Sequence, residues 1–347
     1  MRRSLSSRPV DSGSAEGMSR TFVYCFNPQA CEFAVVMPSY VAVGVVRTRS
    51  RGNSELVTNA FPQLFRARDG HRDEEPLVRR RALAVAKQLA RSVIRAPRDQ
   101  RRFVLIFGCQ RSGTTMLQQT FLDRSWRVLI IEEHDRRIVG SDPRPGETEW
   151  QDYRTVLGRL RRSPFEVVAA KPLVESDRAV ELIDAAEPVK AIWMLRHYQD
   201  VARSNVGRFG IDNPHRDLQP FCSDEPLDWR CRGASEQTRE TVVGLVNEGL
   251  SPLDAAALFW WARNQLYFEQ RLWLDERIRI IRYERACNYS DEVVGALSDY
   301  LEISLPQRSI ARKVRPLPDG AQATMLHPDV ENLCRALWDS FAGCPDL

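Results

Sequence analysis

Short apolar runs recur along the central part of the chain, and stretches with helical spacing of apolar residues separate them. The runs begin at Phe103, Val128, Val167, Val189 and Ile278. Each run is too short for a buried helix and is rich in branched or aromatic residues, which predicts a buried strand. Because strands that alternate with helices form parallel sheets covered on both faces, we expect an α/β fold with a doubly wound parallel sheet.

The same patterns divide the chain into regions. Residues 1–75 show no sustained periodicity and are predicted to be irregular and flexible, while residues 76–101 contain a basic amphipathic helix that we expect to pack on the core. The α/β domain is predicted over residues 102–305. Within it, several prolines predict a long irregular loop at 208–250, and loops of this length are commonly functional. Residues 306–347 are predicted to form a C-terminal tail that packs on the core.

The loop after the first predicted strand combines glycines, hydroxyl side chains and an arginine. The apolar run from Phe103 stops at Gly108, and a helical pattern begins at Met116. A strand, a tight loop and a helix start are how α/β proteins bind phosphate, because the free N–H groups of the loop and first helical turn point the same way. The predicted phosphate-binding residues are Arg111, Ser112, Gly113, Thr114 and Thr115. The sheet is therefore expected to be P-loop-like.

The order of residues in this loop differs from that of nucleotide hydrolases and kinases. Their P-loop is G-x-x-x-x-G-K-[ST], and Thr114 stands here at the lysine position. A nucleoside triphosphate enzyme needs that lysine on the β- and γ-phosphates. The order Arg-Ser-Gly-Thr-Thr instead resembles the 5′-phosphosulfate loop of the sulfotransferase superfamily. That resemblance implies 3′-phosphoadenosine 5′-phosphosulfate (PAPS) as donor, with Arg111 on the 5′-phosphate and the bridging oxygen.

A second candidate phosphate site follows the fourth predicted strand. That strand ends at Arg196, and Ser204 lies eight residues further on. An arginine at a strand end and a serine one to two helical turns later can reach one phosphate together. The pair resembles the 3′-phosphate site of sulfotransferases, although Tyr198 stands where the family often has proline.

A third segment, at residues 279–289, reads as a short strand followed by Tyr283 and Glu284. It resembles the sulfotransferase segment with a Tyr-Glu-x-Leu signature, and the match is partial because Ala286 or Cys287 falls near the leucine position. The resemblance implies that Tyr283 lies beside the adenine or ribose of the donor. A core tyrosine remains the alternative.

Candidate catalytic residues follow the second and third predicted strands. Strand ends of a parallel sheet meet at one edge, so Glu132, Glu133, His134 and Lys171 are expected near the donor loop. The Glu-Glu pair resembles that of the tyrosylprotein sulfotransferase branch, which implies Glu133 as the general base with Glu132 as the rival. His134 is a further alternative, as in the cytosolic small-molecule branch. The resemblance implies that Lys171 stabilises charge on the leaving phosphate.

Composition narrows the partners and the compartment. The 347 residues carry a net charge of +4 diluted by many acids, which favours an anionic small molecule over nucleic acid. The eight cysteines are scattered without metal-ligand spacing, so no metal is predicted and reduced thiols in the cytoplasm are expected. A Cys222–Cys231 pair would fit an oxidising compartment instead. No apolar run is long enough for a transmembrane segment.

The motifs together predict a PAPS-dependent sulfotransferase of the soluble bacterial type. We expect in-line transfer of the sulfuryl group to a hydroxyl or amine of a small molecule, carbohydrate or peptide, with the loop 208–250 as the candidate for binding this acceptor. Two other function classes stay open, an atypical P-loop kinase or hydrolase and a non-catalytic protein that binds PAPS or its bisphosphate product. The identity of the acceptor and the formation of a homodimer also stay open.

Overall fold

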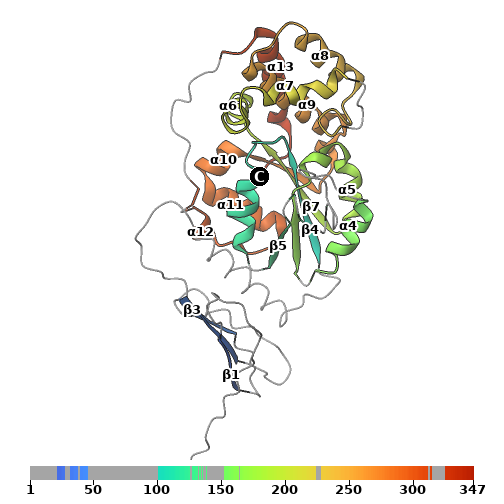
Figure 1. Cartoon of the computed structure of the whole chain (residues 1–347). Helices are drawn as coiled ribbons and strands as arrows, with labels where there is room; N and C mark the ends of the chain where they lie inside the picture. The colour runs from blue at the N-terminus through green and yellow to red at the C-terminus, as the bar shows by residue number, and fades with distance from the viewer. Residues whose placement is uncertain are drawn as a thin grey trace, which may run out of the picture. The chain divides into compact units, whose positions relative to one another are not determined.

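A computed structural model gives the fold of two separate units, Met1–Val93 and Ile94–Leu347 (Figure 1). In the first unit the structure describes the backbone of residues 22–27, 32–37 and 40–45. In the second it describes residues 101–125, 127–131, 133, 135, 138, 152–163, 165–223, 228–311, 313–314 and 325–347.

The first unit contains an antiparallel sheet where the sequence predicted irregular chain. Strands β1 (Phe22–Asn27) and β3 (Tyr40–Val45) both pair with β2 (Glu32–Met37). Runs of valine and aromatic residues supply the strand propensity, and they are too short and too closely spaced to give a sustained pattern. The amphipathic helix predicted over residues 76–101 lies outside the described residues, apart from Arg101.

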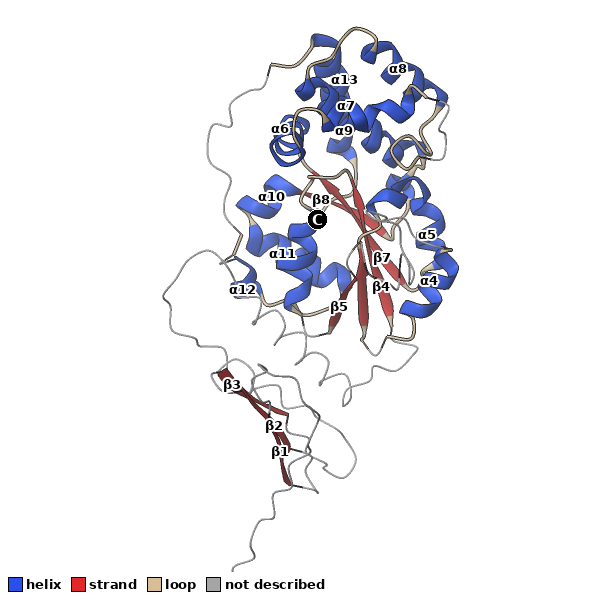
Figure 2. Cartoon of the chain, viewed as in Figure 1, coloured by secondary structure: helices blue, strands red, loops and turns tan. Residues whose placement is uncertain are grey.

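The second unit is built on a five-stranded sheet in the order β5-β6-β4-β7-β8. All neighbouring strands are parallel, and each strand arises from one of the apolar runs (Figure 2). The strands are β4 (Arg102–Gly108), β5 (Val128–Ile131), β6 (Val167–Ala170), β7 (Val189–Leu195) and β8 (Ile278–Arg282). The doubly wound parallel α/β fold predicted from the sequence is confirmed.

Helices cover both faces of this sheet. Alternate residues of β4 enter two different cores, Phe103 and Phe107 on one side and Val104 and Ile106 on the other. The first core is closed by α4 (Tyr153–Leu160), α5 (Ala179–Ala185), α6 (Tyr198–Phe209), α9 (Pro252–Glu269) and α13 (Pro328–Ser340). The second is closed by the helical run 114–124 and by α10 (Tyr283–Asn288), α11 (Ser290–Leu301) and α12 (Gln307–Ala311).

The segment 208–250, predicted as an irregular loop, includes several helical elements. It contains α7 (Asn213–Leu218), the 3₁₀ turn η7 (Gln219–Phe221) and α8 (Glu236–Val246). Two of the prolines that suggested a loop, Pro214 and Pro220, stand in the first turns of α7 and η7, where a missing N–H is tolerated, and Pro226 lies outside the described residues. Ser235 caps α8 by accepting a hydrogen bond from the Thr238 N–H at 3.2 Å.

The long helix α9 anchors the C-terminal part of the chain. Ser251 and Asp254 form a capping box at its start, and its aromatic residues other than Phe268 are buried. Helix α13 packs against α9 through the buried residues Cys334 and Leu337. Among the described residues, no helix combines the length and apolar character that crossing a bilayer requires.

Candidate functional site

The site lies at the carboxyl edge of the sheet, beyond the end of the central strand β4. From β4 the chain crosses to β5 on one side, whereas β7 pairs with the other side of β4. Ligands of open α/β sheets bind at such a topological switch point. The loop 109–113, which we call the donor loop, therefore occupies the position where this fold binds ligands.

Backbone geometry explains the two glycines that flank the donor loop. Gly108 has φ +127°, and a Cβ there would lie 2.5 Å from the carbonyl oxygen of Met194. Gly113 has φ +94°, and a Cβ would lie 2.3 Å from Cδ2 of Tyr283. Between them Arg111 adopts φ +68°, which is unfavourable for a residue with a side chain. The loop is thus tightly packed and strained at the residue that carries its charge.

The hydroxyl side chains of the loop do not all face solvent. Ser112 and Thr114 are buried, and no group among the described residues lies within hydrogen-bond reach of Ser112 Oγ. Thr115 is exposed. Helix α2 (Thr114–Met116) begins directly after the loop and continues as the π-helix η4 (Leu117–Phe121) and the 3₁₀ turn η5 (Leu122–Arg124). The open donors at this point are therefore the N–H groups of the helix start and the Thr115 hydroxyl.

Arginines from three elements converge on the donor loop. Arg111 Nε donates to Ser204 Oγ on α6 at 3.0 Å, and Arg196 Nη1 donates to the Arg111 carbonyl oxygen at 3.4 Å. Burial lowers the pKa of Arg111 below its usual range, and the positive charges of Arg208 and Arg196 lower it further. Among the described residues, no carboxylate lies within ion-pair distance of these three guanidinium groups. The cluster therefore concentrates positive charge at the donor loop, and Arg196 also interacts electrostatically with the partly buried carboxylate of Glu284.

Tyr283 contacts both the donor loop and Arg196. Its ring packs on Gly113 and lies under the Arg196 guanidinium, 4.3 Å from ring centre to Cζ. The next residue, Glu284, accepts a hydrogen bond from the His197 N–H at 2.9 Å and so holds the start of α6. The Tyr-Glu pair therefore connects the end of β8 to both candidate phosphate sites, which were predicted from motifs 85 residues apart.

Lys171 lies beside Glu133 and helix α2, which follows the donor loop. Its Nζ is 3.2 Å from Glu133 Oε1 and donates to Thr115 Oγ1 at 3.0 Å. Lys171 is 6% exposed and Glu133 is 32% exposed, so the carboxylate is the more open partner. Glu132 and His134, the rival bases in the sequence prediction, lie outside the described residues.

Three further residues of the site were missed by sequence reasoning. Gln118 is fully buried and donates to the Ile131 carbonyl oxygen at 2.9 Å, which fixes the strand end that leads to Glu133. Arg208 lies one helical turn beyond Ser204, a spacing that could have indicated a shared face. Gln110 reaches Asp217 on α7, and nothing in the sequence connects these two positions.

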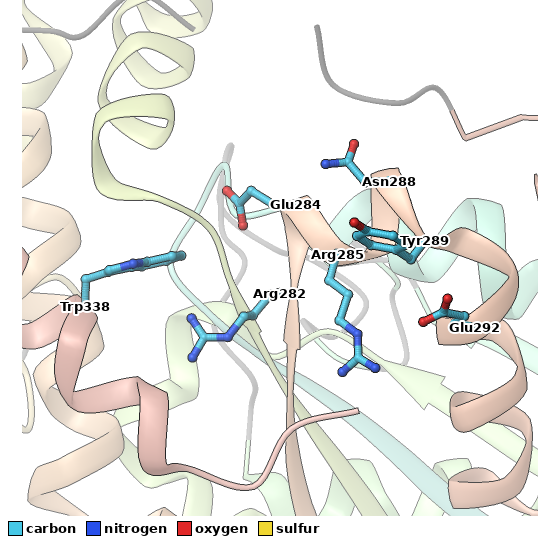
Figure 3. A pocket seen from close by; sticks show the side chains of 7 residues that line it. All are labelled: Arg282, Glu284, Arg285, Asn288, Tyr289, Glu292 and Trp338. Carbon is cyan, nitrogen blue, oxygen red and sulfur yellow. The ribbon is translucent and has the colours of Figure 1, made fainter. Parts of the chain in front are cut away.

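A surface pocket of about 380 Å³ adjoins the Tyr-Glu pair, between α10 and α13 (Figure 3). Two of its arginines hold the C-terminal segment. Arg282 donates to the Phe341 carbonyl oxygen and Arg285 to that of Leu347, both at 2.8 Å. The pocket also includes Trp338, over which the Arg282 guanidinium lies at 5.2 Å. Both arginines of the pocket are therefore engaged in holding the fold.

One group of side chains among the described residues has the spacing of metal ligands, namely Glu248, His327 and Asp329. Glu248 lies 3.8 Å from His327 Nε2, whereas Asp329 lies 3.9 Å from Nδ1 of the same ring. The two carboxylates therefore face different nitrogens, which is the geometry of ion pairs. None of these residues belongs to the cluster around the donor loop.

No disulfide is formed among the described cysteines, and this includes Cys222 and Cys231, the pair considered for an oxidising compartment. Burial raises the pKa of the Cys109 thiol in the donor loop to about 12. A thiol of that pKa is not a nucleophile at neutral pH, so Cys109 contributes packing to the loop.

Comparison with known proteins finds structural similarities at low sequence identity. No protein-family model and no curated protein matches the chain. It resembles the sulfotransferase domain of the Synechococcus PCC 7002 olefin synthase at 14% identity and a TM-score of 0.38, over 68% of this chain and 94% of that one. It resembles mouse sulfotransferase SULT7A1 complexed with PAP at 15% identity and a TM-score of 0.33, over 69% and 72% of the two chains.

Sulfotransferase STF9 from Mycobacterium avium is similar at 11% identity and a TM-score of 0.41, over 76% of this chain and 82% of that one. All three of these structures are sulfotransferases. Similarities of this size do not assign a function, so the function proposed below is drawn from the residues of the site.

Proposed function

We propose that the chain is a sulfotransferase that moves the sulfuryl group of PAPS to a hydroxyl or amine acceptor. The observation that carries this proposal is the cluster of Arg111, Arg196 and Arg208 around a loop that lacks the P-loop lysine. Three guanidinium groups with no carboxylate partner among the described residues suit a ligand with several negative charges. PAPS carries its charges on two separate phosphate groups and a sulfate.

In this proposal the donor loop holds the 5′-phosphosulfate and α6 holds the 3′-phosphate. The N–H groups at the start of α2 and the Arg111 guanidinium bind the 5′-phosphate. Arg196 and Ser204 bind the 3′-phosphate, and the orphaned Arg196 Nε supports this assignment because a buried N–H donor needs an acceptor. Tyr283 orients Arg196 through ring stacking and borders the ribose or adenine.

The chemical step is an in-line displacement at sulfur. Glu133 accepts the proton of the acceptor hydroxyl while the hydroxyl oxygen forms a bond to sulfur. The bond between sulfur and the bridging oxygen breaks, and the electron pair leaves with adenosine 3′,5′-bisphosphate. Lys171, within 3.2 Å of Glu133, and Arg111 stabilise the charge that grows on the leaving phosphate. A positioned general base contributes roughly 10² to 10⁴ in rate.

The acceptor is expected on the side formed by α7 and the segment after it, which follow the donor cluster in the chain. No disulfide joins the described cysteines, which suits a reducing compartment such as the cytoplasm.

Calorimetric titration with adenosine 3′,5′-bisphosphate in EDTA tests the donor assignment. We expect wild type to bind and Arg196→Ala to lose binding, because the arginine supplies charge and bidentate donors to the 3′-phosphate. Arg216→Ala, which removes an exposed arginine of α7, serves as the matched control and should bind like wild type. Failure of folded wild type to bind would overturn the proposal.

Turnover separates the remaining function classes. With PAPS and an acceptor found by screening, Glu133→Gln should lower turnover by roughly 10² or more while bisphosphate binding persists. A kinase or hydrolase would instead require Mg²⁺ and a nucleoside triphosphate. A non-catalytic binder would hold the bisphosphate and show no turnover that depends on Glu133 or Lys171.

A further inference from the structure

The buried carboxylate of Asp217 joins three segments that are distant in sequence. Asp217 is 3% exposed and accepts hydrogen bonds from Gln110 Nε2 and Asn213 Nδ2, both at 2.8 Å, and from Arg230 Nε at 3.0 Å. An ionised carboxylate only accepts, so each partner must donate to it. Through these bonds Asp217 links the donor loop, helix α7 and the segment 228–232.

The bond to Gln110 acts on the strained part of the donor loop. Gln110 directly precedes Arg111, whose φ of +68° persists only if surrounding contacts fix it. Two of those contacts come from Ser204 and Arg196, which are the groups assigned above to the 3′-phosphate. The bond from Gln110 to Asp217 uses no group that would bind the donor. It can therefore hold the loop before and after the ligand arrives.

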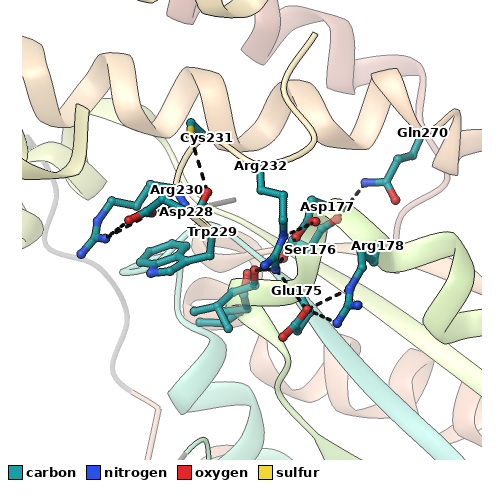
Figure 4. Close-up of polar contacts among 12 residues, drawn as sticks. Glu175, Ser176, Asp177, Arg178, Asp228, Trp229, Arg230, Cys231, Arg232 and Gln270 are labelled. Carbon is teal, nitrogen blue, oxygen red and sulfur yellow. Dashed lines mark hydrogen bonds and ion pairs between the residues drawn. The ribbon is translucent and has the colours of Figure 1, made fainter. Parts of the chain in front are cut away.

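The segment 228–232, which Asp217 contacts through Arg230, is itself fixed by ion pairs. Arg230 also pairs with Asp228 at 3.0 Å. Arg232 pairs with Asp177 at 2.7 Å on the 3₁₀ turn η6 (Leu173–Arg178), which follows Lys171 and Pro172 (Figure 4). The segment 228–232 is thus fixed to the strand end that carries Lys171. A bond from the donor loop to this segment, through Asp217, sets the loop relative to the rest of the site.

We propose that Gln110 and Asp217 form a positioning pair that keeps the donor loop in its anion-binding conformation. The proposal rests on the proposed function for the identity of the ligand. A loop that is already ordered binds its anion without the entropy loss of ordering. Breaking the pair should therefore weaken binding of adenosine 3′,5′-bisphosphate about tenfold, the effect of losing one hydrogen bond to a charged group.

Gln110→Ala is the variant that isolates the pair. It leaves Asp217 with its bonds from Asn213 and Arg230, so the buried carboxylate stays satisfied and the fold is retained. We would measure bisphosphate affinity by calorimetry and, without ligand, amide hydrogen exchange of residues 109–113. The expected result is about tenfold weaker binding with faster exchange in the loop and unchanged protection in β4.

Asp228→Asn is the matched control, because it removes a carboxylate from Arg230 without touching the donor loop. It should leave affinity and loop exchange at wild-type values. If Gln110→Ala and Asp228→Asn lose the same affinity for the bisphosphate, the proposal is overturned. The effect would then belong to the 228–232 segment as a whole. Faster exchange in β4 as well as in the loop would also overturn it, because the change would then be global.

Asp217→Ala, which removes both oxygens that could accept from Gln110, gives a second, independent arm. It should accelerate exchange of the loop amides as Gln110→Ala does, and the double variant should add nothing further in the loop. Exchange at the wild-type rate in Gln110→Ala would overturn the positioning pair. Wild type that folds but does not bind bisphosphate would overturn the proposed function instead, and the exchange result would still decide the role of the pair.

Discussion

Replacing Gly113 by alanine tests whether the donor loop and Tyr283 must fit together for the site to bind its anion. An alanine Cβ would lie 2.3 Å from Tyr283 Cδ2 and 3.0 Å from Cε2. Distances this short cannot persist, so the ring or the loop has to move. Because the ring lies under the Arg196 guanidinium at 4.3 Å, moving it also displaces the arginine assigned to the 3′-phosphate.

The expected free-energy cost of Gly113→Ala has two parts, and a matched variant at another glycine separates them. The left-handed backbone, φ +94°, costs alanine about 1–2 kcal/mol of folding free energy. Displacing the ring removes its contact with Arg196, which costs about 0.5–2 kcal/mol more of folding free energy and also moves the arginine assigned to the 3′-phosphate. Gly249 has φ +82°, and a Cβ there would meet no atom within 4 Å, so Gly249→Ala carries the first cost alone.

Urea unfolding and calorimetric titration with adenosine 3′,5′-bisphosphate measure the two parts. Both variants should lose the cost of the left-handed backbone, Gly113→Ala should lose about 0.5–2 kcal/mol more, and Gly113→Ala alone should bind the bisphosphate about tenfold more weakly. In a Tyr283→Ala background the added Gly113→Ala change should cost no further affinity, since the obstructing ring is gone. Wild-type affinity in Gly113→Ala would refute the reasoning, and so would an equal loss of affinity in Gly249→Ala.

Other changes test the catalytic lysine, a buried acid and the sheet edge. Lys171→Met should lower turnover roughly 10² to 10³-fold with bisphosphate binding retained, whereas the control Lys190→Met on β7 should not; steady-state assays decide this. Burial raises the pKa of Glu284 above its ordinary 4.5, so its ionisation opposes folding and its contribution to stability falls as pH rises through the raised value. Glu284→Gln should therefore flatten the dependence of unfolding free energy on pH above about 4, and a slope like that of wild type would count against it. Deleting residues 345–347 removes the two backbone bonds that cover Ile280 on the edge strand and should cost about 1–3 kcal/mol in urea unfolding.

The strands of the sheet were predictable because each is buried on both faces. A strand such as β7 then reads as an almost continuous apolar run, which Lys190 alone interrupts between Val189 and Leu195. The order of strands was not predictable in this way. Strand order depends on which helices pack on which face, and an apolar run carries no information on its neighbours.

The helices of the 208–250 segment escaped sequence reasoning for a different reason. Helix α7 spans six residues, Asn213–Leu218, which is too short to display a helical period. Pro214 and Pro220 mark the starts of helical turns here, although the same residues also mark loops. Tertiary contacts such as the bond between Gln110 and Asp217 decide between the two, and they involve chain that a local pattern does not sample.

Sequence motifs placed the candidate site residues at one edge of the sheet, and the structure brings several of them into contact. What the motifs could not give is which residue meets which. The bonds from Lys171 to Thr115 and from Arg111 to Ser204 join residues 56 and 93 positions apart. Such pairs are determined by helix packing and rotamers, because many side chains at the same edge have compatible chemistry.

The ion pairs of the arginines distinguish the candidate site from the rest of the fold without reference to any motif. Arg232 and Arg277 each pair with carboxylates, at 2.7 Å from Asp177 and Asp275 respectively, as expected for arginines that stabilise the fold. Within the described part of the chain, Arg111 and Arg196 have no such partner, although both are partly buried. Holding like charges together in this way is unfavourable in the free protein. The arrangement is therefore understandable where an anion of several charges completes it, which is what PAPS would supply.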